Sequence, residues 1–213
     1  MNENNNGRGL FYGVIGVATL IVAIIGATFA YFSVSANIAN NSDIAGSTVE
    51  LSETTITGTL TRETASTVSM VPLKTADLQK GITGEDGKGQ CIDANGAKVC
   101  DIYTLTINNT SNAPVSLAGN LTITATDMAD LRWSLLESTT SATGATAKEV
   151  SDTVIVANEL LAAKTGTKTY YFVIWFNETE ENQNTQAGKS YTGTVSFTAA
   201  NGGKITAQFS SGS

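Results

Sequence analysis

The sequence predicts an all-β fold of the β-sandwich or jelly-roll kind, preceded by one hydrophobic helix at the N-terminus. Beyond residue 40, apolar and polar residues alternate with a period of two, which is typical of half-buried strands. Turn-forming Gly, Asn and Ser separate these short runs, as they do in sandwiches and jelly rolls. We therefore divide the chain into an N-terminal segment (1–30), a linker or donor strand (31–51) and a β-sandwich domain (52–213).

The N-terminal segment carries the longest apolar run of the chain. Residues 10–32, from Leu10 to Phe32, include no charged side chain. As a helix they would span roughly 34 Å, which is enough to cross a bilayer. Two interpretations remain open. The run is long enough for a permanent membrane anchor, but the small residues Thr28 and Ala30 suit a signal peptidase that cleaves before Tyr31.

This region resembles the N-terminus of the TasA/camelysin group of secreted biofilm-matrix proteins. The matching positions are Gly26, Thr28, Phe29, Ala30, Tyr31 and Phe32. Looser matches follow at Tyr103–Thr110, a strand that ends in Asn-Asn, and at Gly188–Phe197. The resemblance implies processing by a SipW-type signal peptidase, a β-sandwich fold, and assembly of secreted subunits into matrix fibres. The longer acidic and lysine-rich insertions of that group are missing from this chain.

Two cysteines follow the linker at a spacing that predicts a disulfide. Cys91 and Cys100 bracket a turn-forming Asp-Ala-Asn-Gly sequence, residues 93–96, with Ile92 and Val99 placed symmetrically about it. A hairpin would bring the two thiols opposite each other, and an exported chain with two cysteines favours that bond. Two thiolates without His or further Cys do not complete a tetrahedral zinc site.

The body of the domain contains several runs that predict strands. The apolar positions of four half-buried strands alternate with polar ones, and Gly193 interrupts one of these strands as a possible bulge. A fifth run, Tyr170 to Phe176, is apolar on both faces and predicts a central strand. The inward positions of the four alternating strands are Tyr103, Leu105 and Ile107; Leu121, Ile123 and Ala125; Tyr191, Val195 and Phe197; and Ile205, Ala207 and Phe209.

The connections and two further segments complete the prediction. Asn201-Gly202-Gly203 predicts a tight hairpin between the last two strands, and residues 137–149 predict an exposed loop. Residues 128–136 and 157–163 have helical character, and both segments are short. Trp133 and Trp175 are expected in the core instead of on a carbohydrate-binding platform.

Composition excludes several classes of function. The chain has no His, so triads with a His base, HExxH zinc sites and haem with a His ligand are excluded. Its net charge of −7 argues against nucleic-acid binding, which needs clustered Lys and Arg. Glu178, Glu180 and Glu181 are expected in a solvated loop and not as a catalytic pair. We expect no enzymatic activity and no cofactor.

A calcium site is the remaining metal hypothesis. Asp86, Asp93, Asn95 and Asp101 lie close to the cysteines in sequence and offer the hard oxygen ligands that calcium prefers. Their spacing does not match an EF-hand loop, and an exposed polar hairpin is the simpler interpretation.

The sequence thus predicts an extracellular or cell-surface structural protein whose partners are further copies of itself or other matrix and surface proteins. Strand addition by the freed N-terminal segment could build fibres, because backbone hydrogen bonds extend an open sheet edge. One alternative is a membrane-tethered module that binds glycans or proteins. A weaker alternative is a type IV pilin-like subunit cleaved after Gly9, in which Val14 stands where pilins usually carry Glu.

Overall fold

The computed structural model describes residues 47–49, 56–64, 69–85, 87–186, 188–200 and 202–211. The predicted hydrophobic helix, the cleavage site at Thr28, Ala30 and Tyr31, and most of the linker lie outside these residues. Within the described part, no helix is both long and apolar enough to cross a membrane.

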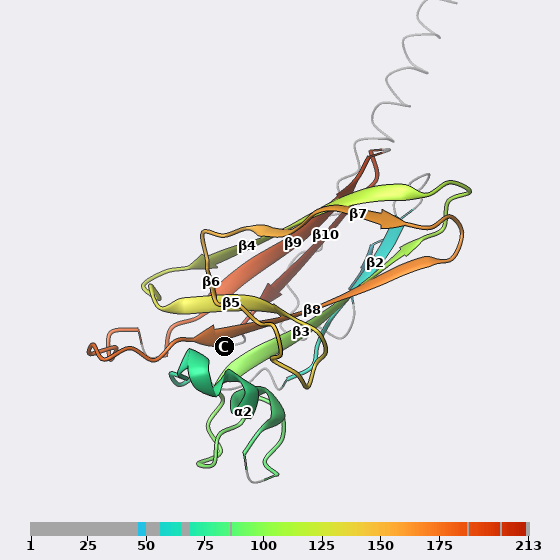
Figure 1. Ribbon diagram of the computed structural model, residues 1–213. Helices are drawn as coiled ribbons and strands as arrows, with labels where there is room; N and C mark the ends of the chain where they lie inside the picture. The colour runs from blue at the N-terminus through green and yellow to red at the C-terminus, as the bar shows by residue number, and fades with distance from the viewer. Residues whose placement is uncertain are drawn as a thin grey trace, which may run out of the picture. The chain divides into compact units, whose positions relative to one another are not determined.

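The described chain is all-β, with strands arranged in two antiparallel sheets (Figure 1). The larger sheet has six strands, in the order β1 (Ser47–Val49), β2 (Ile56–Arg62), β3 (Cys100–Asn109), β8 (Gly166–Phe176), β5 (Leu131–Leu136) and β6 (Lys148–Glu149). The smaller sheet has four strands, in the order β10 (Lys204–Ser210), β9 (Tyr191–Ala199), β4 (Val115–Ala125) and β7 (Val154–Leu161).

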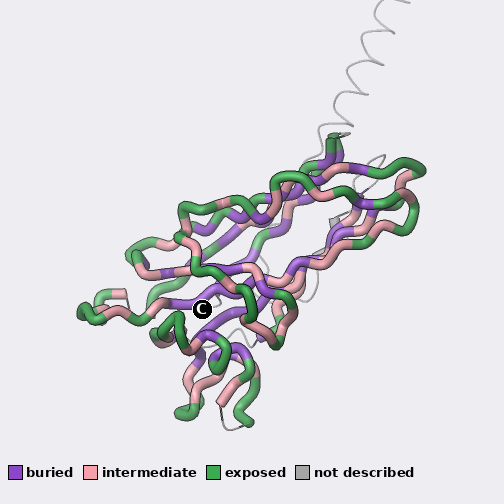
Figure 2. The backbone as a smooth tube through the Cα atoms, viewed as in Figure 1, coloured by how far each residue is buried: buried purple, intermediate pink, exposed green. Residues whose placement is uncertain are grey.

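The core lies between the two sheets, where aromatic side chains of one sheet contact those of the other. The ring of Tyr103 on β3 lies 4.6 Å from that of Phe209 on β10, and Tyr170 on β8 lies 5.1 Å from Phe197 on β9, measured between ring centroids. Buried residues follow these strands with the alternation expected of sheets that bury one face (Figure 2). The four alternating strands and the central strand predicted from the sequence are therefore confirmed.

An excursion of 37 residues, 63–99, connects the neighbouring strands β2 and β3. It includes a 3-10 turn, η1 (Thr75–Asp77), and a short helix, α2 (Leu78–Thr83). Leu78 and Ile82 of α2 are buried, and the backbone N–H of Leu73 donates to the carbonyl of Phe176. These contacts hold the excursion where β3 begins and β8 ends (Figure 1).

Three predictions about local structure were wrong. Residues 157–161 belong to strand β7 and residues 131–136 form strand β5, although both segments were expected to be helical. In each case pairing with a neighbouring strand, β4 or β8, outweighs the helical preference of Leu, Ala and Glu. Gly193 pairs in regular register with Ile123 and Phe209, so it marks no bulge.

Gly193 has a different role. A Cβ atom at this position would lie 2.1 Å from Cζ of Phe209. The glycine therefore leaves room for the Phe209 ring, which packs across β9 toward Tyr103 and Phe172. As the expected hairpin requires, β9 ends at Ala199, β10 begins at Lys204, and the two strands pair antiparallel; Asn201 lies outside the described residues.

Candidate functional site

The predicted disulfide is present and joins the excursion to the first residue of β3. Cys91 and Cys100 are fully buried, with their Cα atoms 4.9 Å apart. Between them, Oδ1 of Asp93 accepts hydrogen bonds from the backbone N–H groups of Asn95 and Ala97 and so shapes the turn. The pairing differs by one residue from the expected symmetry, because Ile92 pairs with Lys98 instead of Val99.

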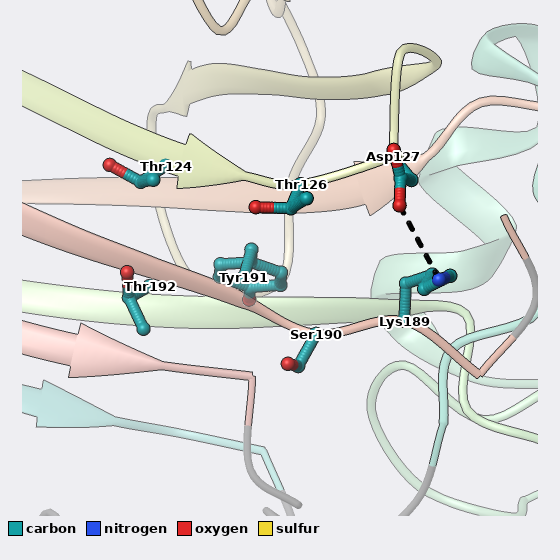
Figure 3. A pocket seen from close by; sticks show the side chains of 7 residues that line it. All are labelled: Thr124, Thr126, Asp127, Lys189, Ser190, Tyr191 and Thr192. Atoms are coloured by element: carbon teal, nitrogen blue, oxygen red, sulfur yellow. Dashed lines mark hydrogen bonds and ion pairs between the residues drawn. The ribbon is translucent and has the colours of Figure 1, made fainter.

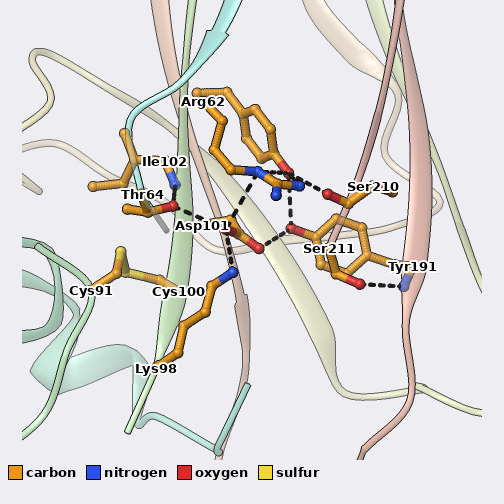
Figure 4. Close-up of polar contacts among 11 residues, drawn as sticks. Arg62, Thr64, Cys91, Lys98, Cys100, Asp101, Ile102, Tyr191, Ser210 and Ser211 are labelled. Carbon is orange, nitrogen blue, oxygen red and sulfur yellow. Dashed lines mark hydrogen bonds and ion pairs between the residues drawn. A yellow bond between two sulfur atoms is a disulfide. The ribbon is translucent and has the colours of Figure 1, made fainter. Parts of the chain in front are cut away.

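A buried polar cluster lies beside this disulfide and is centred on Asp101 (Figure 4). Asp101 is fully buried and its carboxylate contacts groups from three parts of the chain. Oδ1 lies 2.7 Å from Nζ of Lys98 and 3.8 Å from Nε of Arg62, and it accepts a 2.9 Å hydrogen bond from the Thr64 hydroxyl. Oδ2 accepts a 2.7 Å hydrogen bond from the hydroxyl of Tyr191.

Tyr103 extends the cluster toward the C-terminal strand. Its hydroxyl accepts a 2.9 Å hydrogen bond from Nη2 of Arg62 and donates to the carbonyl of Ser210 at 3.2 Å. Burial, and then the negative charge of Asp101, raises the pKa of Tyr103 well above its usual value. Burial is also the main cause of the raised pKa of Tyr191. Both phenols therefore stay neutral and act as hydrogen-bond donors.

The cluster connects the two sheets, because its members come from both of them. Asp101 and Tyr103 lie on β3 of the larger sheet, whereas Tyr191 lies on β9 of the smaller one. Two cations, Arg62 and Lys98, face one carboxylate, and the Lys98 side chain is only 2% exposed. Removing the carboxylate would leave two buried positive charges uncompensated, which is costly in a protein interior.

The calcium hypothesis gains no support from these positions. The oxygens of Asp101 face Lys98, Thr64 and Tyr191, while Asp93 holds its own turn and Asn95 is exposed. Asp86 lies outside the described residues. The part of the chain that the structure describes contains no group of three or more acidic, Cys or His side chains that could hold a metal ion.

A second polar feature, open to solvent, lies at one end of the smaller sheet (Figure 3). This polar hollow has a volume of about 270 Å³. Lys189 and Asp127 form an ion pair of 3.5 Å at its rim. Its lining consists of Thr124, Thr126, Asp127, Lys189, Ser190, Tyr191 and Thr192.

The polar hollow offers hydroxyl groups and one ion pair to a small polar ligand. Sequence reasoning missed it, because its two halves lie more than 60 residues apart and meet through the pairing of β4 with β9 and through the Asp127–Lys189 ion pair. No single stretch of sequence carries a signal for it. Tyr191 contributes to its lining, but the hydroxyl of this residue is bound to Asp101 in the core.

Other expectations about side chains are confirmed. Trp133 and Trp175 are fully buried, and Nε1 of Trp133 donates to the carbonyl groups of Glu149 and Asp152. Glu178, Glu180 and Glu181 are exposed, as expected for a solvated loop.

Comparisons with known proteins add little to this description. No protein-family model matches the chain, and no curated protein matches it significantly. A FixG-related protein from Vibrio parahaemolyticus shares 9% identity with a TM-score of 0.36, over 73% of this chain and 94% of that one. A putative ApaA protein from Bordetella pertussis shares 13% identity with a TM-score of 0.25, over 73% of this chain and 90% of that one. Since both TM-scores lie below 0.5, neither likeness bears on function.

Proposed function

We propose that this protein is an exported structural subunit of the TasA/camelysin-like kind, located at the cell surface or in the extracellular matrix. In this proposal the two sheets form a β-sandwich, the N-terminal hydrophobic helix directs export, and subunits assemble by strand addition. The buried disulfide supports export, because such bonds persist mainly in oxidising compartments outside the cytoplasm.

The observation that carries the assembly mechanism is the short pairing of β1 with β2. β2 has seven residues, but β1 covers only three of them, with Ser47, Thr48 and Val49 opposite Leu60, Thr59 and Gly58. Both ends of β2 therefore lack a strand partner on this side among the described residues. Ile56 and Arg62 mark these two uncovered ends.

This edge fits the proposed donor strand. β1 belongs to the segment 31–51 and, among the described residues, contributes three residue pairs to its own domain. A longer strand from the corresponding segment of a neighbour could replace β1 and pair along the whole of β2, which adds backbone hydrogen bonds. Such a contact is head-to-tail and does not close on itself, so it would generate filaments.

Deleting residues 31–51 tests this mechanism. We expect the shortened chain to fold, with its disulfide formed and both tryptophans buried, but to remain monomeric where the intact protein forms polymers. Sedimentation and electron microscopy of exported protein would measure assembly, and tryptophan emission would verify the fold. A matched control removes residues 180–182, an exposed part of a loop far from β1 in sequence, and should leave assembly intact. Polymers that persist after the N-terminal deletion would contradict strand addition by this segment.

The polar hollow favours a second candidate, a membrane-tethered module that binds glycans or proteins. Its exposed Thr124, Thr126 and Thr192 and the Asp127–Lys189 pair provide donors and acceptors without an assigned role. This candidate requires residues 10–32 to stay in the membrane. Fractionation of cells after export separates the two functions, since a tethered module remains with membranes and a cleaved subunit leaves them.

A further inference from the structure

Strand β7 forms an open edge of the smaller sheet. It has eight residues and pairs with β4 alone among the described strands (Figure 1). The register between β7 and β4 shifts at two places, each with an extra residue on β7. These extra residues are β-bulges, which leave backbone N–H and C=O groups outside the ladder. On its other side β7 has no described strand partner, so its backbone N–H and C=O groups there are also outside any ladder.

The side chains of β7 are unusual for an exposed edge. In the described part of the chain, the two large apolar side chains that remain exposed are Val154, at 50%, and Leu160, at 71%. Both lie on this strand, near its two ends. Proteins usually protect free edges with Lys, Pro, inward-pointing charges or bulges; β7 has its two bulges, but it contains no Lys, Arg or Pro. Its single charge, Glu159, is paired with Lys168 at 2.7 Å.

The other sheet edges are less available. β6 has two residues and β1 has three. β10 lies against the larger sheet, because the side chain of Ile205 packs directly over Gly58 of β2. Two groups of β7 are also occupied, since Nζ of Lys148 donates to the carbonyl of Val154 at the start of the strand and Nδ2 of Asn109 donates to that of Leu161 at its end. Between these two carbonyl groups, no described strand pairs with the free side of β7.

The order of residues along β7 is complementary to itself. Val154 and Leu160 lie three residues on either side of Ala157. In an antiparallel pair of two β7 strands centred on Ala157, each Val154 faces the Leu160 of the other copy. The two Glu159 side chains then face Ile155 and not each other, and the small Ala157 residues meet at the two-fold axis. Such an arrangement uses the same patch on both copies, as closed dimers do.

We propose that β7 is a self-association edge, at which two copies of this chain pair their β7 strands antiparallel about Ala157. The contact buries the two exposed apolar side chains and extends the smaller sheet into a continuous sheet of eight strands across two copies, twice the four of one copy. It does not use the N-terminal segment and therefore stands apart from the strand addition proposed for fibres. Where both contacts form, β7 pairing would join filaments side by side.

Symmetric disulfide trapping tests this pairing. Residues that face each other at a two-fold axis of an antiparallel pair have a Cα separation that suits a disulfide. We expect Ala157→Cys, in the exported full-length chain, to form a covalent dimer under mild oxidation, read as a band of twice the mass on a non-reducing gel. Ala129→Cys is the matched control, since Ala129 is also exposed but lies in a turn away from β7. The native cysteines are fully buried and paired, so they should not exchange.

A second substitution distinguishes edge pairing from random collision. Adding Leu160→Lys to Ala157→Cys should lower the dimer yield at least tenfold, while tryptophan emission remains that of the folded protein. An Ala157→Cys variant that stays monomeric, or that dimerises no faster than Ala129→Cys, would overturn the proposal. So would a dimer yield that Leu160→Lys leaves unchanged. Because the trapped product is a dimer and not a ladder of higher species, the result is independent of whether polymers form through residues 31–51.

Discussion

Tyr191 donates a 2.7 Å hydrogen bond to Oδ2 of Asp101 and thereby connects β9 of the smaller sheet to β3 of the larger one. Both side chains are buried, and 90 residues of sequence separate them. A hydrogen bond to a charged group is stronger than one between neutral groups. Because this bond spans the two sheets, its loss should weaken the packing between them.

Asp101→Ala should be among the most destabilising single substitutions. It leaves Lys98 and Arg62 buried without their counter-charge, and we expect a loss of about 3–5 kcal/mol in the free energy of unfolding. Tyr191→Phe removes one hydrogen bond and should cost less, about 1.5–3 kcal/mol. Urea unfolding followed by tryptophan emission would measure both. The matched control, Asp152→Ala, removes an exposed acid and should cost less than about 1 kcal/mol. Similar losses for Asp101 and Asp152 would contradict the role of the cluster.

Replacing both cysteines by Ala should destabilise the domain without changing its fold. The closed loop is short, with the cysteines nine positions apart, and its loss corresponds to about 2.5–3 kcal/mol of chain entropy in the unfolded state. Denaturant midpoints of the variant and of the oxidised protein would be compared. Adding a reductant to the unfolded wild-type protein before refolding should reproduce the effect. An unchanged midpoint would show that the bond does not constrain the unfolded chain.

Tyr170→Phe should preserve or increase stability at neutral pH. The Tyr170 hydroxyl is buried and has no hydrogen-bond partner among the residues that the structure describes, so its removal relieves a desolvation cost of up to about 1 kcal/mol. A variant that loses more than this at pH 8 would show that the hydroxyl has a partner after all.

The same residue makes stability fall in alkali. Burial, followed by the charge of Glu159, raises the pKa of Tyr170 from 10.0 to about 12. The folded state therefore holds this proton more tightly than the unfolded state. The stabilisation of the folded state that comes from this raised pKa is complete below pH 10 and is lost as the pH rises toward 12. Unfolding free energies of wild type and Tyr170→Phe at pH 8 and pH 11 should diverge, with the variant losing less.

Gly193→Ala should destabilise the protein through a clash with Phe209. The added Cβ would lie 2.1 Å from the ring, so either the ring or the strand must move, at a cost of about 1–3 kcal/mol. Combining Gly193→Ala with Phe209→Leu should lose less than the sum of the two single substitutions, because the smaller side chain makes room. Additive losses would indicate that the glycine is required for another reason.

Sequencing the N-terminus of the protein recovered from its native host should give Tyr31 as the first residue, within a residue or two. Small residues at Thr28 and Ala30 suit a signal peptidase that cuts there. An intact start at Met1 would instead retain residues 10–32 and favour the membrane-tethered module. The sizes of the two products differ enough for intact mass measurement to confirm the result.

Local pattern predicted much of this fold. Strands β3, β8, β9 and β10 alternate or are continuously apolar, and their inward residues are those that the structure buries. The disulfide followed from turn residues placed midway between two cysteines. Strands β5 and β7 escaped prediction because Leu, Ala and Glu favour helices when no neighbour is known. Strand pairing depends on residues far apart in the chain, and pairing with β8 and β4 made β5 and β7 strands.

The polar cluster shows why site residues were harder to identify. Asp101 was considered a calcium ligand because other acids lie near it in sequence. Its actual partners include Arg62 and Tyr191, which come from strands far away along the chain. Asp101 is a charged residue at the start of a strand whose other residues alternate, and this break in the alternation is the signal that the sequence offers. The break marks the position as unusual but does not identify the partners of Asp101.

The disulfide also affects how strongly this domain resists unfolding. In a reducing compartment Cys91 and Cys100 remain thiols, and Cys91 is not fastened to the start of β3. The reduced chain can still reach the same fold, but it lacks the stabilisation of about 2.5–3 kcal/mol that the closed loop provides. The redox state of the surroundings would therefore set how easily the folded domain opens.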